Sequence, residues 1–211
     1  MIMIHSILHL KDIACFIARI NAKNLQSRQF MNKVGAVKRQ KEMIWAAIRE
    51  SAEDRSEESK QDQLGRSVVS NENNVGGEIE PFSPMWTSAF SELHDASFPG
   101  TYYDAEAILN RLHIEHKLLI ISSPDILYGY IYMEIEENHA EASIEYVAIN
   151  PVYREKGVGK RLILHAREAL FSQGVDKITL CVSENNEKSH SLYKQCGFQL
   201  QHEMLFYQLR M

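Results

Sequence analysis

Apolar and polar residues recur with two different periods along the last two thirds of the chain, and this pattern predicts both strands and helices. Residues 157–173 have apolar side chains at helical spacing, and Gly174 follows as a helix-terminating residue would. Further helices are predicted over residues 84–96, 104–116 and 187–196. Strands are predicted over residues 78–82, 118–122, 127–136, 142–149, 177–182 and 203–209. This order of elements predicts an α/β fold with a mixed sheet.

A polar stretch divides the chain before these elements begin. Residues 51–77 contain few large apolar or aromatic side chains, and this composition predicts a flexible linker. The linker separates a short piece, residues 1–50, from a longer one, residues 78–211. The chain of 211 residues is 45% hydrophobic and 24% charged, so it can bury a core without disulfides.

Charge is distributed unevenly between the two pieces. Residues 1–50 carry nine Lys and Arg but three Asp and Glu, whereas the remainder carries 14 and 25, respectively. A basic piece can indicate nucleic-acid binding, but no interleaved aromatic residues or reader motif accompany this charge. Its alternatives are a solvated basic surface, or one that docks on the acidic part. The acidic remainder favours a cationic substrate.

Cysteines, histidines and apolar runs exclude several other classes of protein. Cys15, Cys181 and Cys196 are scattered, so they predict neither a disulfide framework nor a CxxC metal site, and they favour a reducing, cytoplasmic compartment. The nine histidines show no metal-ligand spacing, so no metal is predicted. The first ten residues lack the features of a signal peptide, and no apolar run is long enough for a membrane span.

One stretch has the features of a phosphate-binding loop. After the strand predicted over 142–149, a loop leads into a helix with Gly157 and Gly159 in its first turn. Backbone N–H groups at a helix start lack internal partners, and glycine lets a phosphate approach them. Basic residues add positive charge at Arg154, Lys156, Lys160 and Arg161. The Walker pattern fails at Arg161 and the dinucleotide pattern at Leu162, which leaves another pyrophosphate cradle or a simple tight turn.

A second motif lies about 30 residues further on, and the two together are specific. After the strand over 177–182 the chain has, in order, Asn186, Ser189, Leu192, Tyr193, Gly197 and Phe198. With Arg154-x-x-Gly157-x-Gly159 upstream, the sequence resembles the GCN5-related N-acetyltransferase (GNAT) family from about residue 79 to 211. The resemblance extends to members that acetylate ribosomal-protein N-termini and to members that acetylate small amines, without favouring either.

The resemblance implies the acyl-CoA N-acyltransferase fold, with a splayed central sheet and acetyl-CoA as the cosubstrate. The pantetheine arm would lie between the strands over 142–149 and 177–182. The residues that it implies for coenzyme binding are Val147, Ala148, Ile149, Arg154, Glu155, Lys156, Gly157, Val158, Gly159, Lys160 and Asn186.

The resemblance also implies catalytic residues. Tyr193 stands where the family keeps the acid that protonates the leaving thiolate, although it could be a core aromatic instead. Glu145 could be the general base or an acidic residue that lines the acceptor site. Some family members place a glutamate on the following strand, where this chain has Cys181, and that departure weakens the case for a direct carboxylate base. Neither Cys181 nor Cys196 has a nucleophile's partner in the sequence.

The N-terminal piece repeats a pattern found near the C-terminus. When Gly35 is aligned with Gly197, residues 13–45 follow residues 175–207, with Asn24 on Asn186 and Met31 on Tyr193. Chance is the alternative, because few residues are identical. The hypothesis is that residues 1–48 form a β-α-β segment, the C-terminal half of a second acetyltransferase domain. Lacking the glycine loop and the tyrosine, it should do no chemistry and should pack on the main domain or a second copy.

Two functions from different classes therefore remain. The first is an N-acetyltransferase that acts on a primary amine, such as a polyamine, an aminoglycoside, a lysine or a peptide N-terminus. The second is a catalytically silent module that binds acyl-CoA. The acceptor is set by the turn over residues 98–103 and nearby loops, which carry no motif.

Overall fold

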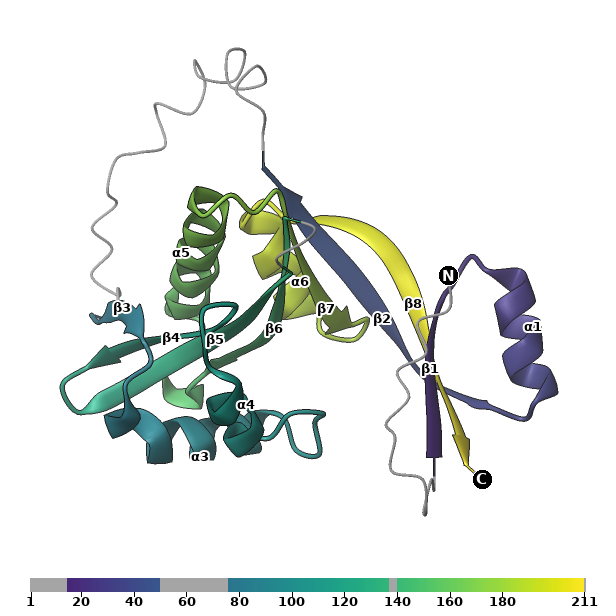
Figure 1. The fold of residues 1–211 in the computed structure, drawn as a ribbon, viewed down its shortest axis with the longest axis horizontal. Helices are drawn as coiled ribbons and strands as arrows, with labels where there is room; N and C mark the ends of the chain where they lie inside the picture. Colours follow the sequence, from purple (N-terminus) through teal and green to yellow (C-terminus); the bar gives the residue numbers. More distant parts are fainter. Residues whose placement is uncertain (1–14, 50–75, 137–139, 211) are drawn as a thin grey trace, which may run out of the picture. The chain divides into compact units, whose positions relative to one another are not determined.

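Figure 1 shows a computed structural model of the chain, which describes residues 15–49, 76–136 and 140–210. The chain forms two compact units, and each is described by itself. The central unit is Ala47–Thr179, and the terminal unit combines Met1–Ala46 with Leu180–Met211. The predicted segments, residues 1–50, 51–77 and 78–211, are each continuous in sequence. The terminal unit is not, because it combines residues from both ends of the chain. Residues 51–75 of the predicted linker lie outside the described residues.

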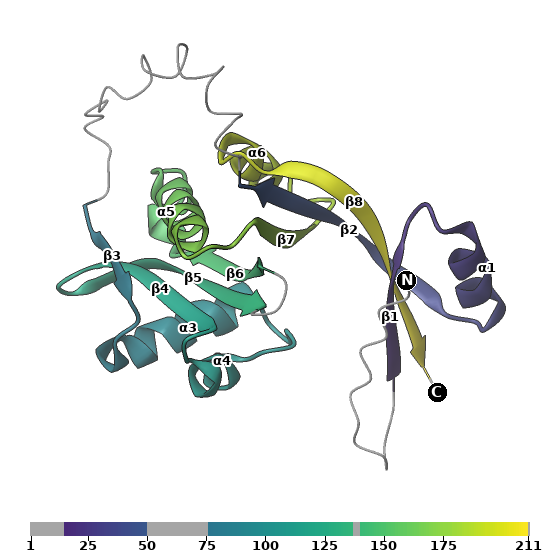
Figure 2. The same cartoon turned by 45° about the horizontal axis from the view of Figure 1, so that its top comes forward.

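The central unit contains an antiparallel meander. Its strands are β3 (Glu78–Pro81), β4 (His116–Ser123), β5 (Ile126–Glu136) and β6 (Glu141–Ile149), paired in that order. Its helices are α3 (Thr87–Ser97), α4 (Ala105–Arg111) and α5 (Val158–Ser172). Figures 1 and 2 show α3 and α4 on one face of this meander and α5 on the other. Each face is thereby covered by an amphipathic helix.

The core under α3 and α4 is largely aromatic. Tyr130 and Tyr132 of β5 are fully buried with Phe90 of α3 and Ile108 of α4. The Phe90 and Tyr130 rings meet edge to face at 4.8 Å between centroids, a favourable geometry for aromatic pairs. Alternate residues of β5 point to this face, as the period-2 pattern predicts.

One predicted helix is shorter than expected. Residues 104–116 were predicted as one helix, but α4 ends at Arg111 and His116 already begins β4. The backbones of His113 and His116 exchange two hydrogen bonds of 3.2 Å, which close a tight turn between these elements. Helical periodicity cannot reveal this ending, because the residues of the turn include no glycine or proline to stop the helix.

The terminal unit is built from strands of both chain ends. Its elements are β1 (Cys15–Asn21), α1 (Leu25–Lys33), β2 (Val37–Ile48), α6 (Glu187–Gln195) and β8 (Gln199–Arg210), with β7 (Lys177–Ser183) entering from the central unit. The strand order is β1-β8-β2-β7, and β8 is antiparallel to both β1 and β2. The β-α-β elements predicted within residues 1–48 are therefore present from Cys15 onward. β8 extends beyond the predicted 203–209 because it has a strand on each side.

No helix in the described parts of the chain has the length and apolar character needed to cross a bilayer.

Candidate functional site: a phosphate cradle and an acidic face

The loop between β6 and α5 has an unusual backbone. Glu155 (φ 61°) and Gly157 (φ 80°) are both in the left-handed region, and Gly157 is the N-cap of α5. No side chain caps this helix start. Its first intrahelical bond runs from the Arg161 N–H to the Gly157 carbonyl, at 3.0 Å. The N–H groups of the first turn therefore have no acceptor within the helix, and alternating backbone hand makes such groups converge on an anion.

Strain at Glu155 supports a functional reading of this loop. A non-glycine residue in the left-handed region costs about 1–2 kcal/mol, and such residues concentrate at functional sites. The sequence placed both glycines at the start of this helix, but only Gly157 is left-handed, and no pattern indicated that Glu155 would share its conformation.

The basic side chains around the loop differ in where they point. Arg154 is exposed, and its Nε donates to the Ile149 carbonyl at 3.0 Å, which ties the loop to the end of β6. Lys156 is exposed beside the Tyr153 ring, with Nζ 5.4 Å from the ring centroid. Arg161, which the sequence suggested as a further cationic residue of the cradle, donates instead to the Gly77 carbonyl at 2.7 Å. The side chain of Val158 is buried, so only its backbone can contact a ligand.

A bulge in β6 presents the predicted base. Tyr146 pairs with Tyr132 and Ile144 with Met133, so Glu145 is an extra residue without a partner in β5. Glu145 is exposed. Beyond the bulge, Val147, Ala148 and Ile149 stay in register with β5 and lead directly into the loop. The cradle and Glu145 therefore lie on one continuous strand and loop.

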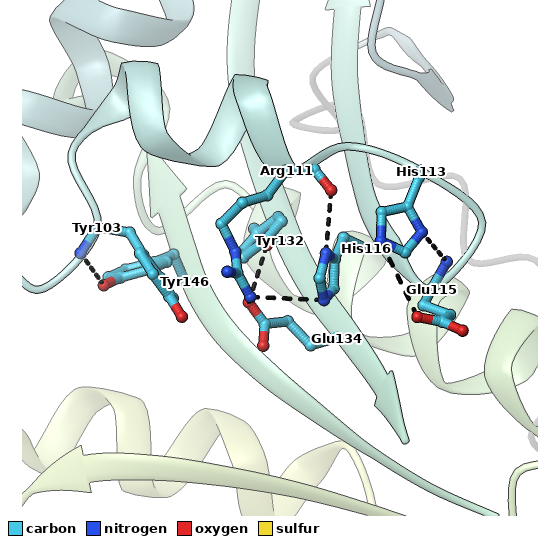
Figure 3. Close-up of polar contacts among 8 residues, drawn as sticks. All are labelled: Tyr103, Arg111, His113, Glu115, His116, Tyr132, Glu134 and Tyr146. Atoms are coloured by element: carbon cyan, nitrogen blue, oxygen red, sulfur yellow. Dashed lines mark hydrogen bonds and ion pairs between the residues drawn. The ribbon is translucent and has the colours of Figure 1, made fainter. Parts of the chain in front are cut away.

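A polar cluster formed by Arg111 of α4 with Tyr132 and Glu134 of β5 was not predicted from the sequence (Figure 3). Arg111 Nη2 donates to Glu134 Oε1 at 3.1 Å, and the Tyr132 hydroxyl donates to the same oxygen at 2.8 Å. The Arg111 guanidinium lies over the Tyr103 ring, 4.5 Å from its centroid. Burial raises the pKa of Tyr103, and the nearby carboxylates of Glu134 and Glu145 raise it further. The field around Tyr103 therefore has an acidic contribution from both strands.

The predicted acceptor turn is held onto this face. The Tyr146 hydroxyl is 2.8 Å from Thr101 Oγ1 and accepts from the Tyr103 N–H at 3.3 Å. Buried His94 contacts the Tyr103 carbonyl through Nε2 at 2.9 Å and the Tyr130 hydroxyl through Nδ1 at 2.5 Å. Because a carbonyl only accepts, Nε2 donates a hydrogen bond to it. The sequence contains His94 in a predicted helix and Tyr130 and Tyr146 in predicted strands. Periodicity alone does not show that these side chains meet.

The other predicted site residues belong to the terminal unit. Asn186 is the N-cap of α6, and its Oδ1 accepts from the Ser189 N–H at 3.2 Å. Tyr193 is half-buried on α6, and burial raises its pKa to about 12, with smaller contributions from Cys196 and Cys181. The Sγ of Cys181 lies 3.4 Å from Oε2 of buried Glu42, a carboxylate of the N-terminal piece. Sequence reasoning did not single out Glu42.

Among the described residues, no group of three or more His, Cys, Asp or Glu side chains lies where it could hold a metal ion.

A mixed α/β fold in which a strand leads through a partly left-handed loop into an uncapped helix is the arrangement expected of an acyl-CoA N-acyltransferase. Comparison with known proteins agrees. The acetyltransferase (GNAT) family matches residues 85–198, slightly more than half of the chain. The chain therefore belongs to this family of N-acetyltransferase enzymes, as its resemblance predicted.

Three relatives define the extent of the similarity. Spermidine N(1)-acetyltransferase of Thermoplasma acidophilum is 28% identical over 131 residues, which cover 59% of this chain and 80% of that protein. A GCN5-related N-acetyltransferase from Sphaerobacter thermophilus has a TM-score of 0.66 at 16% identity. A tandem GNAT protein from the clavulanic acid biosynthesis pathway has a TM-score of 0.65 at 14% identity. Both structures match 93% of this chain, and the chain spans 60% and 64% of their lengths.

Proposed function

We propose that the protein transfers the acetyl group of acetyl-CoA to a primary amine of a small, positively charged acceptor. The observation that carries this proposal is the cradle formed by residues 154–160, in which Glu155 and Gly157 are left-handed at an uncapped helix start. That geometry suits a pyrophosphate, and family membership supports coenzyme A as the molecule that carries it.

Donor binding would use the backbone more than side chains. In this proposal the N–H groups of the first turn of α5 hold the pyrophosphate, and Arg154 and Lys156 supply countercharge. The pantetheine amides would pair with backbone groups of Val147, Ala148 and Ile149. Asn186 already caps α6, so its contact with the coenzyme would use a group other than its capping oxygen.

Acceptor binding would use the acidic face of the central unit, which we define by Tyr103, Glu134 and Glu145. Glu145 is exposed, Glu134 is held in an ion pair with Arg111, and Tyr102 beside Tyr103 is 62% exposed. Carboxylates and aromatic faces attract an ammonium group, so this surface favours a cationic amine. The relative from Thermoplasma acidophilum bears the name of a spermidine acetyltransferase, which supports a polyamine over a peptide.

The proposed chemistry is direct transfer. The amine loses a proton to Glu145, directly or through water, and its nitrogen attacks the thioester carbonyl. A C–N bond forms, the tetrahedral intermediate collapses, and the C–S bond breaks. Tyr193 gives its proton to the departing thiolate and regains one from the nitrogen, which loses its second proton as the amide forms. Glu145 returns its proton to solvent, and the products are the acetylated amine and coenzyme A.

An amine panel tests the function. We expect calorimetry to detect acetyl-CoA binding, and a thiol reagent to detect coenzyme A release with spermidine, spermine or putrescine. Lysine peptides, N-terminal peptides and aminoglycosides should give lower kcat/KM, and neutral monoamines lower still. If neutral amines react as well as polyamines, the role of the acidic face is wrong. If acetyl-CoA binds but no amine reacts, the protein is a silent acyl-CoA-binding module.

Gly157→Ala should weaken coenzyme binding about tenfold, because a left-handed alanine costs about 1–2 kcal/mol and the loop would relax away from the conformation proposed to bind. The free volume at Gly157 is open, so steric clash with the protein does not confuse the result. Gly174, at the other end of α5, has φ +93° and is equally open. Gly174→Ala should therefore destabilise the fold similarly and leave the Kd for acetyl-CoA unchanged. Equal increases in Kd for both variants would show that the loop is not the coenzyme site.

A further inference from the structure

The pairing of β2 with β8 has an internal symmetry. Gly35 and Gly197 are separated by 162 residues, and this offset maps the register onto itself. The pair Glu42–Met204 is its own image. The other pairs exchange: Lys41–Leu205 with Met43–Glu203, Gln40–Phe206 with Ile44–His202, Lys38–Tyr207 with Trp45–Leu200, and Val37–Gln208 with Ala46–Gln199. Even the two register shifts are images of each other. A local twofold axis therefore passes through the Glu42–Met204 pair.

The two helices obey the same offset. Helix α1 (Leu25–Lys33) and helix α6 (Glu187–Gln195) have nine residues each and begin and end at equivalent positions. Asn24 and Asn186 cap them in the same way, accepting from Ser27 N–H at 3.0 Å and Ser189 N–H at 3.2 Å. Both are followed by a left-handed glycine, Gly35 (φ 76°) and Gly197 (φ 84°).

Hydrogen bonds across the strands repeat as well. The Ala22 N–H donates to the Glu203 carbonyl at 2.8 Å, and its image, the Glu184 N–H, donates to the Lys41 carbonyl at 3.0 Å. In the order β1-β8-β2-β7, a strand of one repeat separates the two strands of the other. Neither repeat therefore has a continuous sheet of its own. An alignment by chance would not reproduce strands, caps and cross-strand bonds at one offset.

We infer that residues 15–48 and 177–210 form an internal, strand-exchanged dimer, in which the N-terminal repeat is a built-in partner that positions α6 through Trp45. The repeat at the C-terminus carries Tyr193, and the equivalent residue of the N-terminal repeat is Met31. The N-terminal repeat therefore supplies strands that support the C-terminal repeat and has no proposed catalytic residue of its own. The catalytic consequence rests on the proposed acetyl transfer, whereas the assembly itself does not.

Trp45 joins β2 to α6. Its ring lies 5.6 Å from that of His190, centroid to centroid, and His190 is one turn before Tyr193. His190 Nε2 donates to the Glu184 carbonyl at 3.2 Å, and the Glu184 N–H is bound to β2. The indole Nε1 is buried without a hydrogen-bond partner among the described residues. Burying that donor costs about 1–3 kcal/mol, which offsets part of the stability that the ring gains by packing.

The symmetry supplies a matched control. The image of Trp45 is Tyr207, which packs in the core with Met31 and Leu205 beside α1. Each of these aromatic residues therefore supports the helix of one repeat. Only the helix beside Trp45 carries the proposed acid.

Trp45→Leu and Tyr207→Leu should therefore be compared in the full chain. We expect both to lower Tm. Trp45→Leu should accelerate amide exchange in residues 187–196 and lower kcat about tenfold, with the KM for acetyl-CoA within about twofold, because a small displacement of the acid is costly. Tyr207→Leu should accelerate exchange in residues 25–34 and leave kcat within about twofold of the parent. Trp45→Phe, which keeps the ring, should restore most of kcat.

Two outcomes would overturn the inference. The first is an equal loss of kcat in both leucine variants, which would mean general destabilisation. The second is faster exchange spread evenly over both helices in each variant, which would mean that the aromatic residues do not serve separate repeats. If the parent protein turns over no amine at all, the proposed function fails, and the exchange measurements still decide the assembly.

Discussion

Replacing Tyr193 with phenylalanine should lower kcat about 10²–10³-fold and leave the Kd for acetyl-CoA within about twofold. The substitution removes one hydroxyl from a half-buried ring and keeps its packing against Phe198, whose centroid is 6.1 Å away. The thiolate must then leave without a proton donor. Rapid-quench or steady-state measurement of coenzyme A release, with the best amine from the panel, gives kcat directly.

The pH dependence sharpens this expectation. Burial raises the pKa of Tyr193 to about 12, so its hydroxyl keeps its proton throughout the range in which the enzyme is assayed. A raised pKa favours the neutral, proton-carrying form up to that value, and Tyr193 should therefore add no alkaline limb to the kcat profile below about pH 11. The loss in the phenylalanine variant should have the same size at pH 7, 8 and 9.

A control separates the acid from any tyrosine of the unit. Tyr207 is buried in the same unit, but it packs against Ala18, Ile20 and Met31 of the N-terminal repeat. Tyr207→Phe should leave kcat unchanged. If Tyr193→Phe also leaves kcat unchanged with an acceptor that the parent acetylates, Tyr193 is a packing residue and the acid lies elsewhere.

Removing residues 1–48 should abolish the stable, folded monomer. β8 would lose both neighbouring strands, β1 and β2, and Leu205 and Tyr207 would lose the Ala18, Ile20 and Met31 side chains that bury them. A loss of this kind is comparable with the whole stability of a domain, about 5–15 kcal/mol. We expect aggregation, or association of two shortened chains through their exposed strand edges. Expression in soluble form, light scattering and circular dichroism check this outcome.

Cleavage after folding distinguishes a structural partner from a folding aid. A protease site placed within residues 51–75 lets the intact chain fold before it is cut. The N-terminal fragment should then stay bound to the remainder on gel filtration and separate only in denaturant. A shortened chain that is soluble, monomeric and as stable as the parent would contradict the role assigned to the N-terminal repeat.

Two carboxylates, Glu145 and Glu42, differ in how far the sequence could point to them. Glu145 stands in a strand pattern directly before the glycine loop, so the sequence drew attention to it. Glu42 lies 139 residues from Cys181 in the chain, yet its Oε2 is 3.4 Å from that sulfur. It also forms a 3.0 Å ion pair with Arg19. Such proximity depends on which strands become neighbours, and local periodicity does not contain that information.

The sequence by itself predicted most elements of this protein and the position of the loop proposed to bind the donor. Apolar periodicity located the helices and strands, since burial of one face requires it. The Arg154 to Gly159 motif located this loop, and Gly157 within it has the left-handed backbone that glycine adopts at low cost. The echo of Gly197 at Gly35 hinted at a repeat, but few identities supported it.

Tertiary structure decided how these parts combine. The strand order and register relate residues 15–48 and 177–210 as two repeats about a local twofold axis. The backbone hydrogen bonds that form this pairing depend little on side-chain identity, so few identical residues were needed. The β6 bulge at Glu145, the Arg111–Glu134 cluster and the Trp45–His190 contact arise in the same way. Each joins residues that are distant in the chain or sets them against a partner strand, and long-range pairing is the part of folding that local sequence patterns do not encode.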